Sequence, residues 1–406
     1  MKKIYSVFVL TLIFCSSIFS QQFNQIAAVS EKGYDVLFYK AIGNDNGGPK
    51  RLLVYYGNKD NEEYVIYDKD GKFISKYNVG EKITRSGNFF FHKNKLYVLG
   101  KKLYTLDLAS LKLTSTNYNF PAENYKILEI SESEPDDLLL AGTESAVDIY
   151  DLKTFKKMFT INREVTQKYA RPSVQADGIV VFLNKQNELA GFSIKDKKII
   201  WKLNAGTAKI TMLGISLGSY NDPLGHYVIY KDKNNYYLYS CTGGGHLYKQ
   251  DLLTGKVLLE KKSFKGTGNN AGMLTSLYLE DMNKDGVLDL VGAAVDDNMY
   301  CLNGKDFSEI WEYDTDNEHQ MPLALYDING DGIKDVFGVN DYDNILSIVD
   351  GRTGKLIKNI NVKEGKSFFQ TFPVVEDFNE LGYINMMVKT ASGSLRIYKI
   401  KLAGKS

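Results

Sequence analysis

Two stretches of the sequence place oxygen-bearing side chains at alternating positions, a pattern that suits a hard cation. The stretches cover residues 281–289 and 327–335, and both read Asp-x-Asn-x-Asp-Gly-x-x-Asp. Side chains at positions 1, 3 and 5 converge when the backbone curls, and the glycine at position 6 permits the sharp turn. We therefore predict two calcium sites, each with the carbonyl of position 7 as a further ligand. The predicted ligands are Asp281, Asn283, Asp285, Val287, Asp289, Asp327, Asn329, Asp331, Ile333 and Asp335.

The residues around these stretches predict that each loop joins two β-strands. Position 12, where a helix–loop–helix calcium motif carries a bidentate glutamate, holds Gly292 in the first stretch and Gly338 in the second. Short β-branched segments interrupted by glycine follow both stretches, which favours strand over helix. Without a cation, the carboxylates of Asp281, Asp285 and Asp289 should repel one another and raise one another's pKa. Calcium would remove that cost.

A second pattern recurs along the chain and predicts a repeat built from β-strands. It consists of an apolar strand that ends in a polar residue, usually Asp or Asn, then a short turn that often ends in Gly-Lys, and another strand. A period of about 40 to 50 residues with four strand-like segments is typical of a β-propeller, in which each sheet is buried only against its neighbours. Copies begin at Tyr64, Leu103, Val147, Leu189, Leu247, Met299 and Leu346, with a partial copy at Leu395.

The length of the chain predicts an all-β propeller of eight four-stranded antiparallel blades. A mature chain of 386 residues (406 − 20) gives about 48 residues per blade, close to the 46 residues between the two predicted loops (327 − 281). Seven blades of about 55 residues are the alternative. The last unit lacks a fourth strand, which residues 23–30 can supply. The N-terminal strand would then close the ring and leave no open sheet edge.

These two patterns resemble known propeller repeats. The calcium-type loop, the strand after it and a Gly-Lys turn such as residues 350–355 resemble the FG-GAP/VCBS repeats of secreted β-propellers, a group that includes the integrin α-subunit propeller. The hairpin pattern also resembles the PQQ-like repeat, and only Trp201 and Trp311 keep the tryptophan that follows it there. The first resemblance implies structural calcium between the first and second strands of a blade, on the rim remote from the ligand face. Quinoproteins use an adjacent-cysteine disulfide that this chain lacks, so we expect no PQQ.

The first twenty residues predict a secretory signal peptide (1–20), which leaves a single propeller domain over residues 21–406. Two lysines precede an apolar run over residues 4–19 that is short for a membrane span and is followed by polar sequence. A lipoprotein signal that uses Cys15 is the alternative, although a bulky residue precedes that cysteine. No later run reaches the roughly 20 apolar residues of a transmembrane helix. We expect a protein secreted to the periplasm or the exterior, with no membrane span.

Charge and cysteine content exclude some functions and leave one question open. The chain carries 50 Lys and Arg against 49 Asp and Glu, and it has no basic run. It therefore lacks the positive surface that nucleic-acid binding requires. Cys241 and Cys301 fall in predicted strands of different repeats, so they could form a disulfide in an oxidising compartment or remain buried thiols.

The architecture predicts a non-catalytic propeller, stabilised by calcium, that binds a protein or glycan through the loops of its other rim. A carbohydrate-active enzyme, either a polysaccharide lyase or a hydrolase, is the alternative, although the sequence shows no nucleophile motif and no identifiable catalytic carboxylate pair. We expect a monomer. The contact candidates on the loop face are Tyr169, Asn269, His319, Tyr342 and Phe369.

Overall fold

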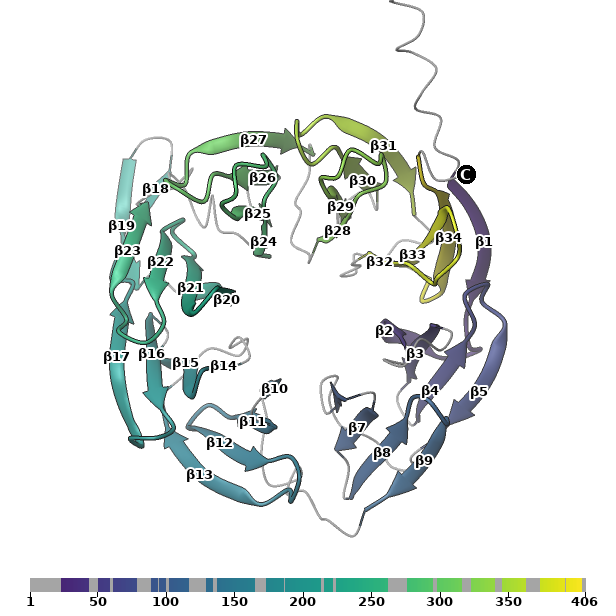
Figure 1. Ribbon diagram of the computed structural model, residues 1–406, viewed down its shortest axis with the longest axis horizontal. Coiled ribbons are helices and arrows are strands. Elements are labelled where there is room, and N and C mark those ends of the chain that lie inside the picture. The colour runs from purple at the N-terminus through teal and green to yellow at the C-terminus, as the bar shows by residue number, and fades with distance from the viewer. Residues whose placement is uncertain are drawn as a thin grey trace, which may run out of the picture.

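The computed structural model forms a closed ring of β-sheets around a central axis (Figure 1). The described residues are 23–43, 50–58, 61–78, 89–93, 95–99, 102–116, 129–133, 137–164, 173–185, 187–212, 215–221, 224–261, 276–294, 298–315, 323–339, 345–362, 373–390 and 392–403. Within these ranges the structure contains strands, turns and no helix. This part of the chain has no helix with the length and apolar content needed to cross a membrane.

The first four blades follow one another along the chain, with their strands in sequence order from the axis outward (Figure 1). Blade 1 contains β2 (Asp35–Ile42), β3 (Arg51–Gly57), β4 (Glu62–Tyr67) and β5 (Phe73–Tyr77). Blade 2 contains β6 (Phe89–His92), β7 (Lys95–Leu99), β8 (Leu103–Asp107) and β9 (Lys112–Ser115). Blade 3 contains β10 (Glu129–Ser133), β11 (Leu138–Gly142), β12 (Ala146–Asp151) and β13 (Lys157–Asn162). Blade 4 contains β14 (Val174–Ala176), β15 (Ile179–Lys185), β16 (Glu188–Ser193) and β17 (Lys198–Asn204).

Four further blades complete the ring, and the prediction of eight blades is confirmed. Blade 5 contains β20 (Leu224–Asp232), β21 (Asn235–Thr242), β22 (Leu247–Asp251) and β23 (Val257–Lys261). Blade 6 contains β24 (Tyr278–Glu280), β25 (Asp289–Ala293), β26 (Asn298–Leu302) and β27 (Glu309–Asp314). Blade 7 contains β28 (Ala324–Tyr326), β29 (Asp335–Val339), β30 (Ile345–Val349) and β31 (Leu356–Asn361). Blade 8 contains β32 (Val374–Glu376), β33 (Tyr383–Lys389), β34 (Leu395–Lys401) and β1 (Phe23–Val29).

The N-terminal strand closes the ring, as the sequence predicts. Strand β1 pairs antiparallel with β34, from Phe23 opposite Ile400 to Val29 opposite Leu395, and forms the outer edge of blade 8. The two ends of the propeller are therefore held in one sheet. Because β1 also packs against blade 1 through Ala27, which lies against the turn at Gly71, the closure involves both neighbouring blades.

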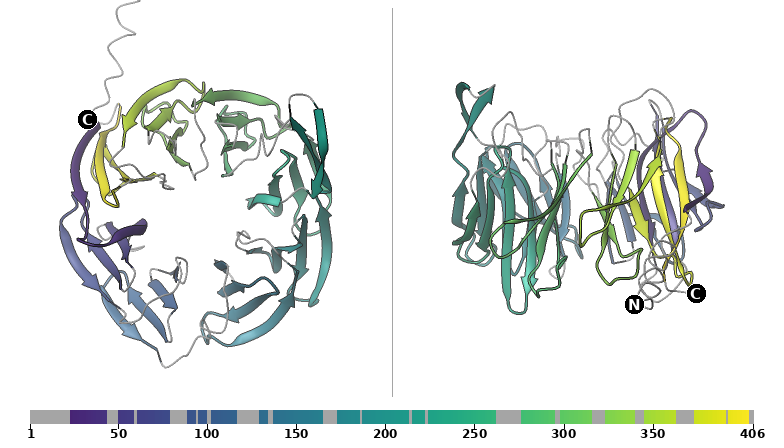
Figure 2. Two further views of the ribbon diagram at one scale, coloured as in Figure 1. Left: turned by 180° about the vertical axis from the view of Figure 1, so that it is seen from behind. Right: turned by 90° about the horizontal axis from the view of Figure 1, so that it is seen from above.

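One element has no counterpart in the sequence analysis. Strands β18 (Thr207–Met212) and β19 (Ile215–Asn221) form a separate two-stranded sheet between blades 4 and 5. The side view shows this hairpin standing out from one face of the ring (Figure 2). The repeat of four strands per unit does not predict it, because the hairpin is an insertion between two complete blades.

The core lies between adjacent blades rather than inside any one of them. The second strands β11 and β29 are buried along their whole length, because neighbouring blades cover both faces of each sheet. The fourth strands alternate instead, and Leu356 on β31 is 47% exposed. Every copy of the repeated sequence pattern falls on a third strand, from β4 at the N-terminal end to β34 at the C-terminal end. The pattern therefore marks the buried layer of each blade.

Two tryptophans join blades by contacting the turn between the third and fourth strands of the next blade. Trp201 on β17 donates its Nε1–H to the carbonyl of Leu252 at 2.6 Å, and Trp311 on β27 donates to the carbonyl of Gly351 at 2.7 Å. Each indole lies against a turn glycine in the left-handed region, where an added Cβ at Gly255 would come within 2.4 Å of the Trp201 Cβ. The glycine of the Gly-Lys turn therefore provides the space for the indole.

The two cysteines of the propeller lie in different parts of the core and are free thiols. Cys241 belongs to β21 and packs in the cluster between blades 5 and 6, whereas Cys301 on β26 packs between blades 6 and 7. Burial raises the pKa of the Cys301 thiol far above its usual range. A disulfide between the two is therefore not formed, and Cys301 is held as the neutral thiol.

Candidate functional site

The two predicted calcium loops occupy equivalent places in neighbouring blades. Residues 281–289 join β24 to β25 in blade 6, and residues 327–335 join β28 to β29 in blade 7. We call them the blade 6 loop and the blade 7 loop. In an antiparallel blade, the turn between the third and fourth strands lies on the same rim as the turn between the first and second. Each loop therefore lies beside the Gly-containing turn of its own blade.

Both loops are organised by the same hydrogen bonds from backbone N–H groups to side-chain oxygens. In the blade 6 loop, Asp281 Oδ2 accepts from Gly286 at 3.0 Å, Asn283 Oδ1 from Asp285 at 2.9 Å, and Asp285 Oδ1 from Val287 at 2.9 Å. The blade 7 loop repeats these three contacts at 2.9, 2.9 and 2.8 Å. The loops thus have a common fold as well as a common sequence.

The carboxylate at position 9 is buried and connects the loop to the turn between the third and fourth strands. Asp289 and Asp335 are both 0% exposed. Asp289 accepts from the N–H groups of Met282 at 3.1 Å and Gly304 at 3.0 Å. Asp335 accepts in the same way from Ile328 and Gly351, and no ion pair reaches either carboxylate among the described residues.

The two glycines whose N–H groups donate to these carboxylates cannot carry a side chain. A Cβ at Gly304 would lie 1.8 Å from the carbonyl oxygen of Leu288, and one at Gly351 would lie 1.9 Å from that of Lys334. The backbone of the turn therefore lies directly against the end of the loop. Only glycine allows the buried carboxylate to reach the N–H of the turn at this separation.

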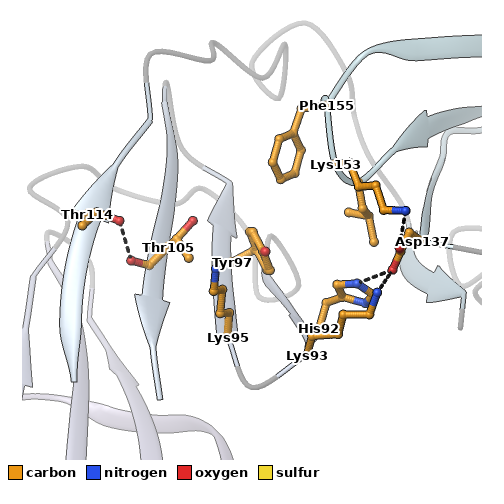
Figure 3. Close-up of a pocket in the computed structure, with 10 residues that line it drawn as sticks. His92, Lys93, Lys95, Tyr97, Thr105, Thr114, Asp137, Lys153 and Phe155 are labelled. Atoms are coloured by element: carbon orange, nitrogen blue, oxygen red, sulfur yellow. Dashed lines mark hydrogen bonds and ion pairs between the residues drawn. The ribbon is translucent and has the colours of Figure 1, made fainter. Parts of the chain in front are cut away.

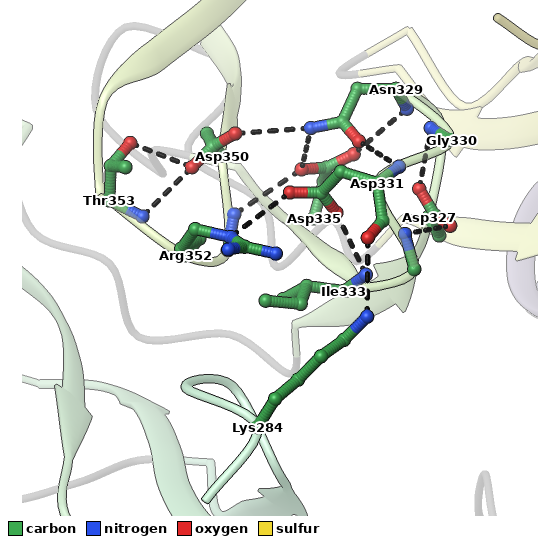
Figure 4. Close-up of polar contacts among 12 residues, drawn as sticks. Lys284, Asp327, Asn329, Gly330, Asp331, Ile333, Asp335, Asp350, Arg352 and Thr353 are labelled. Atoms are coloured by element: carbon green, nitrogen blue, oxygen red, sulfur yellow. Dashed lines mark hydrogen bonds and ion pairs between the residues drawn. The ribbon is translucent and has the colours of Figure 1, made fainter.

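Exposed cations neutralise part of the negative charge and connect the two loops to each other. Lys305 Nζ lies 2.8 Å from Asp285 Oδ2, and Arg352 Nε lies 3.3 Å from Asp331 Oδ2. Lys284 of the blade 6 loop donates to the carbonyl of Asp331 at 3.2 Å (Figure 4). In return, Lys334 of the blade 7 loop pairs with Glu280 of blade 6 at 2.7 Å. The two loops thus form one continuous polar surface.

The pKa shifts differ from the mutual repulsion that the sequence predicts. The ammonium of Lys305 lowers the pKa of Asp285, so the prediction is wrong for that residue. Burial is the main reason that the pKa of Asp289 is raised, and the charge of Asp285 adds less. Burial also raises the pKa of Asp335 to about 7, with a smaller contribution from Asp350. Desolvation is therefore the main influence on the pKa at the buried position 9, whereas in the blade 6 loop a neighbouring cation is the main influence on the pKa at the exposed position 5.

The donor set of each loop is compatible with a hard cation. Each nine-residue loop contains three carboxylates and one lysine, which leaves two negative charges in excess, and a cation of the neighbouring turn, Lys305 or Arg352, pairs with position 5. A carboxylate has about four lone-pair sites, so oxygens that accept one N–H retain capacity for a metal. Among the described residues, no three His, Cys, Asp or Glu side chains lie at metal-ligand spacing. The predicted sets also rely on an Asn amide and a backbone carbonyl.

The predicted contact candidates of the opposite rim lie outside the described residues. This applies to every one of them: Tyr169, Asn269, His319, Tyr342 and Phe369. The signal peptide over residues 1–20 lies outside the described residues as well. The contact candidates and the signal peptide therefore stay predictions from the sequence.

The structure contains a pocket that the sequence analysis missed, between blades 2 and 3. Its volume is about 560 Å³, and its lining includes Lys93 from the turn between β6 and β7 and Lys153 from the turn between β12 and β13 (Figure 3). Within it, Asp137 accepts from His92 Nε2 at 3.0 Å, lies 3.1 Å from Lys153 Nζ and pairs with Lys93. The side-chain hydrogen bonds from Lys93 and Lys153 lower the pKa of Asp137 to about 2.

Comparisons with known proteins place the chain among propellers by fold alone. No family model and no curated protein matches the sequence. The crystal structure of the computationally designed Ika8 protein superimposes with a TM-score of 0.58 at 14% identity, over 92% of this chain and 99% of that chain. The crystal structure of BamB from Moraxella catarrhalis does so with a TM-score of 0.55 at 12% identity, over 93% and 100%.

Proposed function

We propose that this chain is a secreted, non-catalytic binding propeller that recognises a protein or glycan partner. Its closed ring has two rims, and the loops of blades 6 and 7 stabilise one of them. The turns on the other rim, between the second and third strands and between successive blades, are then available for a partner. Fold alone is a weak guide to function, and the likeness to BamB supports the architecture rather than a particular ligand.

The observation that carries the calcium part of this proposal is the set of hydrogen bonds that the two loops share around their surplus carboxylates. Asp281, Asn283 and Asp285, with the carbonyl of Val287, would hold calcium in blade 6, and the equivalent residues would do so in blade 7. Calcium would supply positive charge to loops that have an excess of about two negative charges each. The role is structural, because each loop contacts the turn of its own blade and the two loops contact each other's blades.

Calcium is expected to raise the melting temperature of the mature protein relative to chelator. Extracellular calcium loops have dissociation constants of about 10⁻⁴ to 10⁻³ M, so millimolar calcium adds roughly 1 kcal/mol per site by linkage. The Asp285→Ala/Asp331→Ala double variant should lose this response. Thermal unfolding with 5 mM calcium, roughly five times the weaker of those constants, and with chelator measures it.

The matched control is Asp177→Ala/Asp232→Ala. These two acids are exposed and lie at the turns between the first and second strands of blades 4 and 5, where the calcium-type sequence is absent. The control should keep the full response to calcium. A wild-type melting temperature that is the same in calcium and in chelator would show that the metal assignment is wrong.

Photo-crosslinking tests the proposed partner face. A benzophenone amino acid is placed at Tyr169, His319 or Tyr342 on the predicted contact rim, and at Phe73 or Leu258 as exposed controls on the outer strands β5 and β23. We expect one common protein product from at least two rim positions and none from the controls. A glycan partner would instead give binding on a glycan array that Tyr169→Ala reduces. Equal cross-linking from all positions, with no glycan binding, would contradict the proposal.

A further inference from the structure

The interface between blades 2 and 3 lacks the tryptophan that fills two other blade interfaces. Thr114 on β9 pairs with Thr105, two residues before the end of β8 at Asp107. Trp201 has the same position, because it pairs with Gly191, two residues before the end of β16. In blade 6, Trp311 pairs with Cys301 near the end of β26. Thr114 therefore occupies the place from which an indole reaches the next blade elsewhere in the ring.

The facing turn of blade 3 is also changed. Phe155 donates its N–H to Asp151 in the same turn geometry as Gly255, which contacts Trp201. Phe155 has a φ of 53°, so a bulky side chain stands in a backbone conformation that favours glycine. The Thr114 and Phe155 pair thus replaces the Trp and Gly pair.

The Thr114 and Phe155 pair does not fill the interface between blades 2 and 3. In blade 6, Phe307 takes the equivalent turn position with a φ of 57° and is 0% exposed, packed in an apolar cluster. Phe155 is only half-buried, and its ring centroid lies 5.8 Å from that of Tyr97 on the opposite wall. The remaining cavity of about 560 Å³ is within the usual range of about 300 to 1,000 Å³ for ligand pockets.

The cavity has aromatic walls and a cationic rim. Three lysines line it, Lys93 and Lys95 from blade 2 and Lys153 from blade 3, and Asp137 is the one acid among its lining residues. Lys93 and Lys153 already pair with Asp137. The ammonium of Lys95 forms no hydrogen bond or close ion pair within the described part of the chain, and its charge lowers the pKa of Asp107, its cross-strand neighbour, only as a minor contribution. An anion that entered the cavity would therefore meet an excess of positive charge.

We propose that the interface between blades 2 and 3 is a binding pocket for a small aromatic carboxylate. The aromatic ring enters the space that an indole fills at the interfaces of blades 4 and 5 and of blades 6 and 7, and it packs against Tyr97 and Phe155, whose rings contact each other. The carboxylate points to the rim and pairs with Lys95, while Lys93 and Lys153, which gather around Asp137 across the pocket, add positive charge (Figure 3). Stacking between aromatic rings and charge-assisted hydrogen bonds supply the recognition.

Calorimetric titration with indole-3-carboxylate, with neutral indole as the comparator, tests this assignment. We expect saturable 1:1 binding of the carboxylate and at least about tenfold weaker binding of indole, because indole forms no charge-assisted hydrogen bond. Lys95→Gln should weaken carboxylate binding by about five- to tenfold. Lys102→Gln, an exposed lysine of the same blade next to the opposite end of β8, is the matched control and should bind as the wild type does.

A second variant tests the location independently of charge. Thr114→Trp/Phe155→Gly restores the pair found at the interface of blades 4 and 5, so the protein's own indole would fill the pocket and abolish binding. Circular dichroism confirms that this variant is folded, and Lys95→Gln remains informative in any case because Lys95 is exposed. Absence of saturable binding to the wild type would overturn the proposal. Equal affinity for indole, or unchanged binding in the restored-tryptophan variant, would overturn it as well.

Discussion

Replacing Trp311 with alanine is expected to lower the free energy of unfolding by about 3 to 5 kcal/mol. The indole is 5% exposed, packs over Gly354 and donates to the carbonyl of Gly351. Its removal leaves a cavity between blades 6 and 7 and a turn carbonyl without its donor. Trp201→Ala should have a similar effect between blades 4 and 5, where Leu252 accepts the equivalent hydrogen bond.

Equilibrium unfolding in guanidinium measures this loss, and intrinsic fluorescence reports it interface by interface. The chain has two tryptophans, so each single variant leaves one reporter at the other interface. Trp311→Phe is the matched control, because it keeps a ring but removes the donor, and it should cost less than the alanine variant. A Trp311→Ala protein within about 0.5 kcal/mol of the wild type, the range of an ordinary surface substitution, would show that the indole does not stabilise the interface.

Asp335→Ala is expected to destabilise the protein by about 2 to 5 kcal/mol in the presence of chelator, because buried N–H groups lose their acceptor. Asp335 is 0% exposed and accepts from Ile328 at 3.0 Å and from Gly351 at 3.2 Å. Chelator separates this effect from any loss of calcium. Asp289→Ala should behave alike in blade 6, where Met282 and Gly304 are the donors.

The comparison variant for Asp335 is Asp331→Ala in the same loop. The Asp331 side chain is 31% exposed, so its backbone donor can bond to water after the change. In chelator we expect it to lose less than half as much stability as Asp335→Ala. Denaturant midpoints at constant ionic strength provide the measurement. Equal losses in the two variants would show that the buried carboxylate has no special role in the turn.

These two predictions meet at one residue. Gly351 donates its N–H to Asp335 of its own blade and accepts through its carbonyl from Trp311 of the preceding blade. Side chains that hold the same residue should not act independently. We therefore expect the double variant to lose less stability than the sum of the single variants. The turn between β30 and β31 is thus a connection between blades as well as a turn within one.

Much of the fold could be predicted from the sequence because its repeat is local. The copies that begin at Tyr64 and Leu346 fall on β4 and β30, since a strand buried on both faces requires a continuous apolar run wherever it occurs. The period and the length then predicted eight blades, and residues 23–30 were correctly assigned to the last one. The hairpin of β18 and β19 was missed because an insertion between complete repeats carries no periodic signal.

The candidate sites likewise combine features that the local sequence predicts with features that depend on tertiary packing. The oxygen pattern of residues 281–289 is a property of nine consecutive residues, so the sequence by itself determined that the chain has two such loops and that each connects two strands. Only the tertiary structure decided that Asp289 is buried against Gly304 and that Thr114 takes the place of a tryptophan facing Phe155. These contacts join separate turns or separate blades. Their existence depends on the register of strands and the packing of neighbouring sheets, which no local pattern of residues specifies.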